Sequence, residues 1–314
     1  MGKDALRMGK RQQASFDEHY GVVYRERWAD LKAALLAGAP KISRVNRFAE
    51  AGDSLLRETP EPIADWCPEC LGWVAPGPDS SSPDEESLEA VYEMDLGSVL
   101  VAKALQVGEG MEVLDLCAAP GGKSLILAEE LANSGVLVAN ELSRARRFKL
   151  RAILDRYLPP ELLQRVKVTG YDGTTFGMKH QGCFDRVLVD APCSAEGHLI
   201  RRPDELARWS PSRTSQLARR QYALLCSALL TVREGGRLVY ATCSISPKEN
   251  DGVIQRLLKR KAGQVTVRAF ASPLGEATDW GWQILPDKHG AGPAYFAVLE
   301  RMGKDSESGV PTAN

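Results

Sequence analysis

Short apolar runs alternate with longer amphipathic stretches over residues 91–302 of this chain. Five of these runs have the Val, Leu and Tyr content of strands: 111–116, 136–141, 165–170, 184–190 and 236–243. Nearly continuous apolar strands that alternate with helix-length segments are typical of parallel sheets covered by helices on both faces. The pattern therefore predicts an α/β fold with a doubly wound, mostly parallel sheet. Two later runs, 264–270 and 294–302, bring the predicted sheet to seven strands.

The segment before residue 75 has a different pattern. Residues 17–38 place apolar side chains near helical spacing, at Val22, Trp28, Leu31, Leu35 and Leu36. Residues 75–90 are dense in Pro, Gly, Ser and acidic side chains, which favours a loop. We therefore expect a small, mainly helical N-terminal cap, a linker, a main domain and a disordered tail, over residues 1–74, 75–90, 91–302 and 303–314.

A helix start is predicted after the fifth run. Ser246, Pro247 and Glu249 occupy the positions of an N-cap residue, a first helical residue and a capping-box partner. The chain is therefore expected to enter a helix directly beyond Ser246.

Composition narrows the class of protein. The 314 residues are 44% hydrophobic and 26% charged, which is typical of a globular protein with one large domain and a smaller one. No apolar run is long enough for a membrane span or a secretory signal. Seven cysteines, an odd number, do not suggest a disulfide framework. We expect a soluble monomer in the cytoplasm, with an organelle such as the mitochondrion as the alternative that the basic start permits.

The net charge of −1 gives no global attraction to nucleic acid. Any polyanion must therefore bind to local basic patches. One candidate patch lies between the fourth and fifth runs and consists of Arg201, Arg202, Arg208, Arg213, Arg219 and Arg220. Two interpretations of these arginines are equally consistent with the sequence: contact with RNA phosphates, or a solvated helix face. A second basic run, from Arg144 to Arg151, is interpreted as a solvated helix face.

A loop of small residues follows the first strand of the main domain. It comprises Cys117, Ala118, Ala119, Pro120, Gly121, Gly122 and Lys123, and it leads into a helical stretch. Its backbone N–H groups and the helix N-terminus can approach a ligand closely. The glycine spacing is not that of a dinucleotide or phosphate loop. By itself, the loop is either a ligand site or a tight turn.

Acidic residues stand at the ends of three successive strands. Glu141 closes the second strand, Asp172 follows the third, and Asp190 closes the fourth. Ligands of open parallel sheets lie outside the carboxyl ends of the strands, so these groups are expected to line one crevice. Glu141 suits a ribose diol, and Asp172 suits an adenine amino group.

Two cysteines also stand at strand ends. Cys193 follows the fourth strand in DAPCS, and Cys243 follows the fifth in TCS. If these strands are neighbours, their ends lie about 5 Å apart, and both thiols face one pocket. A pair of thiols in one pocket suits the methylation of cytosine at carbon 5. This carbon is a poor nucleophile, so its methylation requires a thiolate to add at carbon 6. Asp190 is placed to hold and polarise the pyrimidine, and the local sequence permits either thiol as the nucleophile.

The other cysteines are interpreted without a catalytic role. Cys117, Cys183 and Cys226 are interpreted as small buried hydrophobes. Cys67 and Cys70 have the spacing of half a zinc site, but no second pair or His cluster accompanies them. We therefore predict no metal.

With these residues identified, the chain resembles the Sun-domain, RsmB-like family of RNA cytosine-5 methyltransferases. The likeness extends from about Phe16 to Met302. Its specific elements are the segments 44–46, 113–124, 139–143, 184–194 and 238–250. The residues at 92–98 depart from the commonest pattern of the family. Together with the two ends of the chain, residues 92–98 most resemble the mitochondrial ribosomal RNA branch of the family.

The resemblance implies a class I methyltransferase fold for residues 91–302 and an RNA-facing cap. It implies that residues 117–123, Glu141, Asp172 and Asp190 bind S-adenosylmethionine. Cys243 would then be the nucleophile, and Cys193 would serve product release.

Ribosomal RNA is the expected substrate, with transfer RNA as the alternative, and a ribosomal subunit or a partner protein is expected to help deliver it. Two further readings are a catalytically idle RNA-binding assembly factor and a methyltransferase for proteins or small molecules. The thiol pair argues against both, because neither activity needs a covalent thiol adduct.

Overall fold

The computed structural model of the chain describes residues 15–50, 52, 55, 62–72, 88–131 and 134–303. The basic start (1–14), most of the predicted linker (75–87) and the predicted tail from residue 304 lie outside the described residues. The described part of the chain contains no helix that is both long and apolar enough to cross a membrane.

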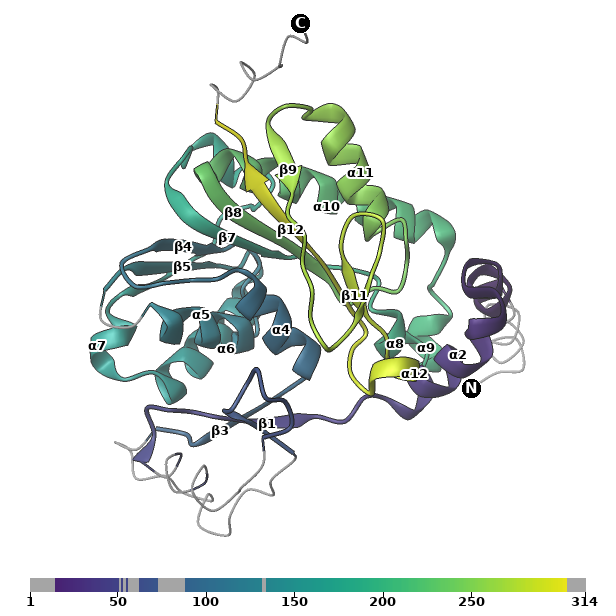
Figure 1. Cartoon of the computed structure of the whole chain (residues 1–314), viewed down its shortest axis with the longest axis horizontal. Helices are drawn as coiled ribbons and strands as arrows, with labels where there is room; N and C mark the ends of the chain where they lie inside the picture. Colours follow the sequence, from purple (N-terminus) through teal and green to yellow (C-terminus); the bar gives the residue numbers. More distant parts are fainter. Residues whose placement is uncertain are drawn as a thin grey trace, which may run out of the picture.

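Within the described residues, the centre of the molecule is a sheet of nine strands (Figure 1). Its order is β10, β11, β12, β8, β7, β4, β5 and β6, and β9 also pairs with β12. The five predicted strands are β4 (Glu112–Asp115), β5 (Val136–Asn140), β6 (Val166–Thr169), β7 (Phe184–Asp190) and β8 (Val232–Thr242). Neighbours among these five pair in parallel, whereas β12 (Ala294–Arg301) runs antiparallel to β8. The mostly parallel α/β sheet is therefore confirmed.

The count of seven strands is wrong. Runs 264–270 and 294–302 correspond to β9 (Val265–Val267) and β12, but β10 (Glu276–Ala277) and β11 (Trp282–Ile284) were not predicted. These two strands pair with each other, and β11 adds to the edge of β12. Strands of two and three residues are too short to show an alternating pattern, so only their pairing, β10 with β11 and β11 with β12, defines them.

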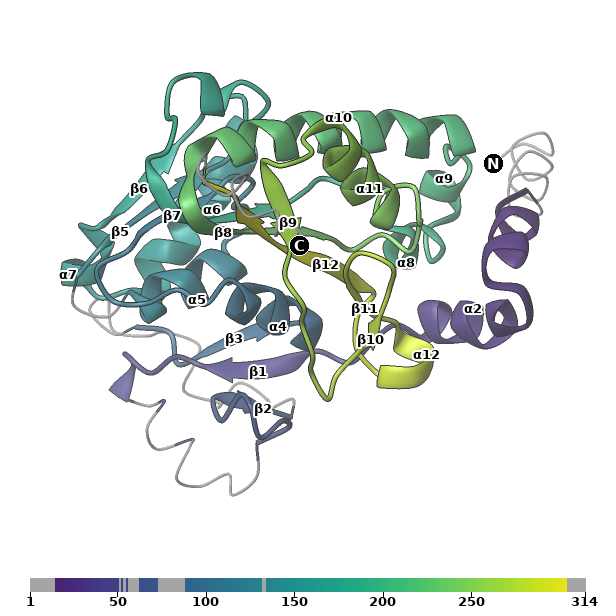
Figure 2. The same cartoon turned by 45° about the horizontal axis from the view of Figure 1, so that its top comes forward.

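Helices cover both faces of the sheet (Figures 1 and 2). One face carries α4 (Leu96–Ala104), α5 (Gly122–Glu130), α6 (Arg144–Tyr157) and α7 (Pro160–Leu163), and the other carries α10 (Pro211–Thr231) and α11 (Asp251–Arg260). Successive strand residues point to opposite faces, so Val113 packs with the α4 and α5 core and Leu114 with the α10 and α11 core. This two-faced burial explains why the strands read as continuous apolar runs.

The predicted N-terminal helical region is present. Residues 15–24 are helical, and η1 (Arg25–Arg27) and α2 (Trp28–Ala37) follow. Trp28, Leu31 and Leu35 are buried as expected, but Val22 and Leu36 are 74% and 47% exposed. The two helices are separated by the 3-10 turn, so a single helical spacing does not hold over residues 17–38.

The N-terminal region also contains strands that were not predicted. β1 (Ile42–Val45) pairs with β2 (Cys70–Leu71) and β3 (Val91–Met94) in a small antiparallel sheet. Arg44 of β1 forms an ion pair with Glu129 of α5, and both side chains are only 3% exposed. Burial opposes the charge on Arg44, but Glu129 more than offsets this and raises the pKa of the guanidinium. The pair fixes the small sheet to the main domain.

A third core joins the N-terminal helices to the segment after β7. That segment contains α8 (Glu196–Leu199) and α9 (Pro203–Leu206), and the remaining short elements are η3 (Phe176–Met178) and α12 (Pro286–His289). Phe16, Tyr20 and Leu31 pack there against Leu199 and Trp209. The N-terminal helices therefore lie beside the segment that carries Cys193.

The predicted start of the helix after β8 is wrong. α11 begins at Asp251, with Asn250 as its N-cap residue, and residues 247–250 form turns. The carboxyl group of Glu249 does not close a capping box, because it accepts hydrogen bonds from Ser194 and Gln221. Glu249 therefore bonds to residues that are distant in the sequence and does not form the predicted capping box.

Candidate active site

The two strand-end cysteines lie together. β7 and β8 are parallel neighbours, with Asp190 opposite Ala241, so the segments beyond them leave the sheet side by side. The Sγ atoms of Cys193 and Cys243 are 3.1 Å apart. A single planar substrate of the size of a pyrimidine can therefore contact both thiols.

The surroundings of the two thiols differ. Cys243 is exposed, whereas Cys193 is half-buried. The hydrogen bond with Cys243 and burial both raise the pKa of the Cys193 thiol well above its usual value. Cys193 is thus held in its protonated form beside an accessible partner.

Asp190 forms an ion pair with a residue of the small-residue loop. Its Oδ2 atom is 2.9 Å from Nζ of Lys123, which also donates to Oγ of Ser98 at 3.1 Å. Burial opposes the charge on Lys123, but attraction to Asp190 and the hydrogen bond to it outweigh burial and raise the pKa of the ammonium group. Lys123 therefore stays charged and fixes the Asp190 carboxyl group at the end of β7.

The small-residue loop joins β4 to α5. Gly121 has a φ of +131°, which disfavours any side chain, and a Cβ atom there would lie 3.1 Å from Cγ2 of Ile153. A Cβ atom at Gly122 would lie 2.7 Å from Cε1 of Tyr92. The glycines are therefore required for packing against α6 and β3. The sequence interpretation had assigned them to close approach by a ligand.

Two hollows lie on either side of this loop. The wide hollow has a volume of about 400 Å³ and is lined by Cys117, Glu141, Asp172, Arg146 and Arg220, among others. The narrow hollow has a volume of about 180 Å³ and is lined by residues 117–123 with Tyr92, Asp115 and Asp190. The two hollows adjoin at Cys117, which lines both, and the three acidic residues are divided between them. Glu141 and Asp172 share the wide hollow, and Asp190 faces the narrow one.

The acids of the wide hollow already accept hydrogen bonds. Oε1 of Glu141 accepts from the backbone N–H of Ser143 at 2.8 Å, and Oε2 is 3.1 Å from Arg146. Oδ1 of Asp172 accepts from the backbone N–H and the hydroxyl of Thr174, and these bonds lower the pKa of the carboxyl group. Both carboxylates are held in fixed positions in which they can accept further bonds from hydroxyl or amino groups of a ligand.

Several residues of these hollows were missed from the sequence. Arg146 bonds to Glu141 and to the carbonyl oxygen of Ala119, so it lines the hollow although its side chain is 49% exposed. Asp115, at the end of β4, accepts a hydrogen bond of 2.7 Å from Ser124. Burial raises the pKa of Asp115 to about 7. Its position at a strand end, like that of the other acids, was a signal that could have identified it.

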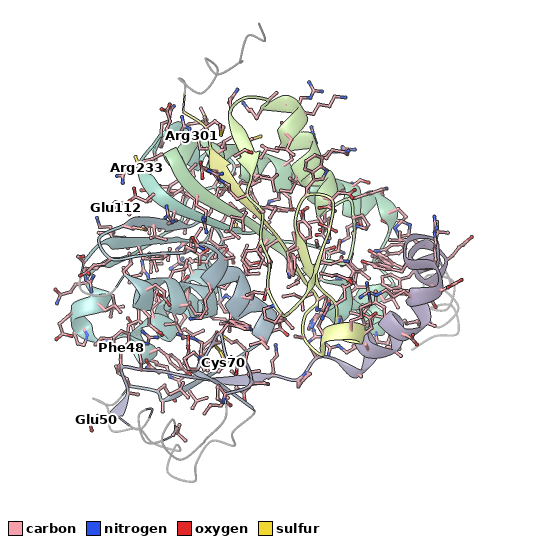
Figure 3. All side chains as sticks on the ribbon, viewed as in Figure 1. Phe48, Glu50, Cys70, Glu112, Arg233 and Arg301 are labelled. Atoms are coloured by element: carbon pink, nitrogen blue, oxygen red, sulfur yellow. A yellow bond between two sulfur atoms is a disulfide. The ribbon has the colours of Figure 1, made fainter. Side chains whose placement is uncertain are left out.

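The remaining cysteines differ in part from expectation. Cys183 is exposed, so its interpretation as a buried residue is wrong. Cys67 and Cys70 form a disulfide across a tight turn with a Cα separation of 5.4 Å, a pairing that the sequence had not suggested. Figure 3 labels Cys70 in the small-sheet region. Within the described ranges, no group of three or more His, Cys, Asp or Glu side chains could hold a metal ion.

The site lies at one edge of the sheet. Figure 3 labels Glu112, Arg233 and Arg301 at the opposite edge, where the parallel strands begin and β12 ends. The thiols, Asp190, Glu141 and Asp172 all lie beyond the carboxyl ends of their strands. This is the edge at which open α/β sheets bind ligands.

Comparisons with known proteins give consistent results. A family model described as 16S rRNA methyltransferase RsmB/F matches residues 102–300. The mitochondrial tRNA (cytosine(34)-C(5))-methyltransferase of Danio rerio is 38% identical over 68% of this chain and 62% of that protein. The 5-cytosine rRNA methyltransferase NSUN4 of Bos taurus is 31% identical over 92% of this chain and 88% of that protein. The chain thus spans less than two thirds of the length of the first relative.

A solved structure shares the fold. The structure of NSun6 from Pyrococcus horikoshii with SFG matches with a TM-score of 0.73 at 20% identity, over 91% of this chain and 97% of that one.

Proposed function

The chain belongs to the 16S rRNA methyltransferase RsmB/F family, and from this premise we propose that it methylates carbon 5 of a cytosine in RNA. The observation that carries the proposal is the separation of 3.1 Å between the Sγ atoms of Cys193 and Cys243, beside the Asp190–Lys123 ion pair. A methyltransferase for amines or hydroxyl groups needs no thiol pair, because those nucleophiles need no covalent activation. An idle RNA-binding factor would need neither thiol.

The chemistry assigns the thiols different roles. Cys243 gives up its thiol proton to solvent, and the thiolate sulfur then bonds to carbon 6, which moves electron density onto carbon 5. Carbon 5 then takes the methyl group and loses its proton, and the bond between sulfur and carbon 6 breaks. Cys243 suits the attack because it is exposed. The family resemblance also implies that Cys243 is the nucleophile. Cys193 lies at contact distance from Cys243 and is assigned to the later elimination step.

Asp190 and Lys123 act on the base. We assign the Asp190 carboxyl group to the N3 and amino edge of the cytosine, where it orients the ring beside the thiols. Lys123 keeps this carboxyl group in position. These two residues therefore set the alignment on which attack at carbon 6 depends.

The hollows fit S-adenosylmethionine, the methyl donor of this reaction, which supplies an electrophilic methyl group when bound. The carboxylates of Glu141 and Asp172 suit the ribose hydroxyls and the adenine amino group, because all of these ligand groups are donors. Cys117 lines both hollows, and the whole loop from Cys117 to Lys123 lines the narrow one. The structure of NSun6 with SFG, an analogue of this donor, supports the assignment.

Ribosomal RNA is our proposed substrate. The bovine rRNA enzyme matches 92% of the chain, which supports this choice. The 38% identity with a tRNA enzyme makes transfer RNA the second candidate. The name of that enzyme includes a mitochondrial location, so we propose mitochondrial action beside the cytoplasmic one. Bisulfite sequencing of total RNA, with and without the gene, would identify the modified cytosine.

One gel with two variants tests the mechanism. We expect Cys243→Ala to abolish methylation and any covalent protein–RNA adduct, because no other group activates carbon 5. We expect Cys193→Ala to add to cytosine and then fail to release it, so that an RNA adduct survives denaturing electrophoresis. Labelled RNA and unlabelled donor suffice for the measurement. An adduct found only with Cys243→Ala would reverse the two assignments.

A further inference from the structure

Two buried carboxyl groups lie behind the thiols. Glu196 and Glu249 are both 0% exposed. Glu196 follows Cys193 in the segment beyond β7, and Glu249 follows Cys243 in the segment beyond β8. Neither belongs to the ion pair or to the hollows described above. Burial of two acidic groups so close to a reactive centre is costly unless each is hydrogen-bonded.

Their hydrogen bonds cross between the two segments. Glu249 accepts from the backbone N–H of Ser194 at 3.0 Å and also from the Ser194 hydroxyl. Glu196 accepts from the backbone N–H of Ile245 at 3.1 Å and from the Ser244 hydroxyl at 3.2 Å. Ser194 is the residue after Cys193, and Ser244 is the residue after Cys243. Each carboxyl group therefore holds the backbone beside the cysteine of the other segment.

Helices hold each carboxyl group in turn. Gln221 of α10 donates to Oε2 of Glu249 at 2.6 Å and to the carbonyl oxygen of Pro192 at 2.9 Å. On the other side, the hydroxyl of Tyr20 donates to Oε1 of Glu196 at 2.6 Å. The hydroxyl of Tyr24 donates to the carbonyl oxygen of Ile245, also at 2.6 Å. The N-terminal helix and α10 thus fix the two segments from opposite sides.

We propose that Glu196 and Glu249 are positioning residues that act as a crossed pair, holding Cys193 and Cys243 at the separation and orientation that the two-thiol reaction needs. The backbone bonds carry the argument. A turn beyond a strand has no ladder partner to fix it, and here each turn takes its partner from the other segment. The geometric part stands without the proposed function, and the part that concerns catalysis rests on it.

Oxidation of the two thiols measures their geometry without RNA or methyl donor. Diamide oxidises two adjacent thiols to one disulfide, and its azo bond takes up the two electrons and two protons that they lose. Peptide mass spectrometry identifies the Cys193–Cys243 disulfide and separates it from Cys67–Cys70. We expect this disulfide to form rapidly in the wild-type protein, because the sulfurs are already in contact.

The carboxyl variants should slow this oxidation. We expect Glu249→Ala and Glu196→Ala to lower its rate at least about tenfold, because the crossed backbone bonds are lost. The variants Glu249→Gln and Glu196→Gln keep one acceptor oxygen and the side-chain volume, so they should fold and show an intermediate loss. Glu129→Gln is the matched control, because it removes a buried carboxyl group from the Arg44 pair, away from the thiols.

The pH dependence of the oxidation rate distinguishes an effect on the position of the thiols from an effect on their ionisation. The oxidation rate is measured from about pH 6 to about pH 9, so that thiolate formation and the limiting rate are resolved. A positioning role lowers the limiting rate. A shift of the profile along the pH axis with an unchanged limiting rate would overturn the proposal, as would wild-type oxidation in all four folded variants. Thermal unfolding curves show which variants are folded.

Methylation assays on the same proteins test the catalytic part. We expect the Gln variants to lose turnover at least about tenfold with little change in the KM for RNA. If the carboxyl variants oxidise slowly but the wild-type protein transfers no methyl group to RNA, the proposed function is rejected. The geometric role of the crossed pair is then still supported. Normal turnover together with slowed oxidation would reject the catalytic part of the proposal.

Discussion

The carboxyl group of Glu249 should make stability depend on pH. Burial, followed by repulsion from Glu196, raises its pKa from an ordinary 4.5 to about 7, although bonds from Ser194 and Gln221 oppose the rise. Between these two values the folded chain binds a proton that the unfolded chain has lost. The stability contributed by the protonated group is therefore complete below the unfolded pKa and is lost as pH rises towards 7.

Comparison with Glu249→Gln isolates this effect, because glutamine does not titrate. From about pH 5 to about pH 8, we expect the wild-type protein to lose up to about 3 kcal/mol of unfolding free energy relative to the variant. Urea unfolding at several pH values measures the difference. A difference that stays constant with pH would show that the pKa of Glu249 is ordinary in the folded chain, and a change in the opposite direction would show that folding lowers it.

At the scale of elements, the turn between β4 and α5 is a sterically constrained part of the proposed cofactor site. Gly121 has a positive φ, and its absent side chain faces Leu150 and Ile153 of α6. We expect Gly121→Val to weaken S-adenosylmethionine binding at least about tenfold, or about 1.4 kcal/mol, because the turn must shift away from α6. Isothermal calorimetry measures the affinity.

A second glycine provides the control for this variant. Gly182 also has a positive φ, of +59°, but a Cβ atom there would meet nothing within 4 Å. Gly182→Val therefore also places a side chain at a positive φ, but without a packing conflict, and it should bind the donor as the wild-type protein does. If Gly121→Val bound equally well, the turn would not form part of the donor site.

At the scale of the whole molecule, RNA binding must depend on local surfaces. The net charge is −1, and the arginines of the predicted patch, from Arg201 to Arg220, are exposed. Arg220 lines the wide hollow, so this end of the patch adjoins the donor site. Phosphates placed here would direct a nearby base towards the thiols.

The form of the RNA should then decide the rate. A target cytosine must leave its helix to meet both thiols, and unstacking costs a few kcal/mol for a paired base. We expect methylation of a cytosine in a hairpin loop to be at least about tenfold faster than in the fully paired counterpart. Initial rates with labelled donor compare the two RNAs at equal salt concentration. Faster reaction of the paired RNA would reject this picture.

The sequence by itself determined much of the main domain. Strands β4 to β8 follow from apolar runs that are buried on both faces, and such runs depend only on neighbouring residues. The loop 117–123, Cys193 and Cys243 could be identified for the same reason, because each follows a recognisable strand. Their proximity followed once β7 and β8 were taken as neighbours in a parallel sheet. The roles of these residues remain predictions.

Only the tertiary structure decided which distant groups meet. Glu249 fits a local capping box in the sequence, but its carboxyl group bonds to Ser194, 55 residues away. Glu196 reaches Ile245 across 49 residues, and Arg146 turns from a helix surface to Glu141. Strand β11 exists because the edge of β12 supplies its partner, and β10 pairs in turn with β11. A buried polar group takes whichever partner the packed chain brings near, and no local pattern records that choice.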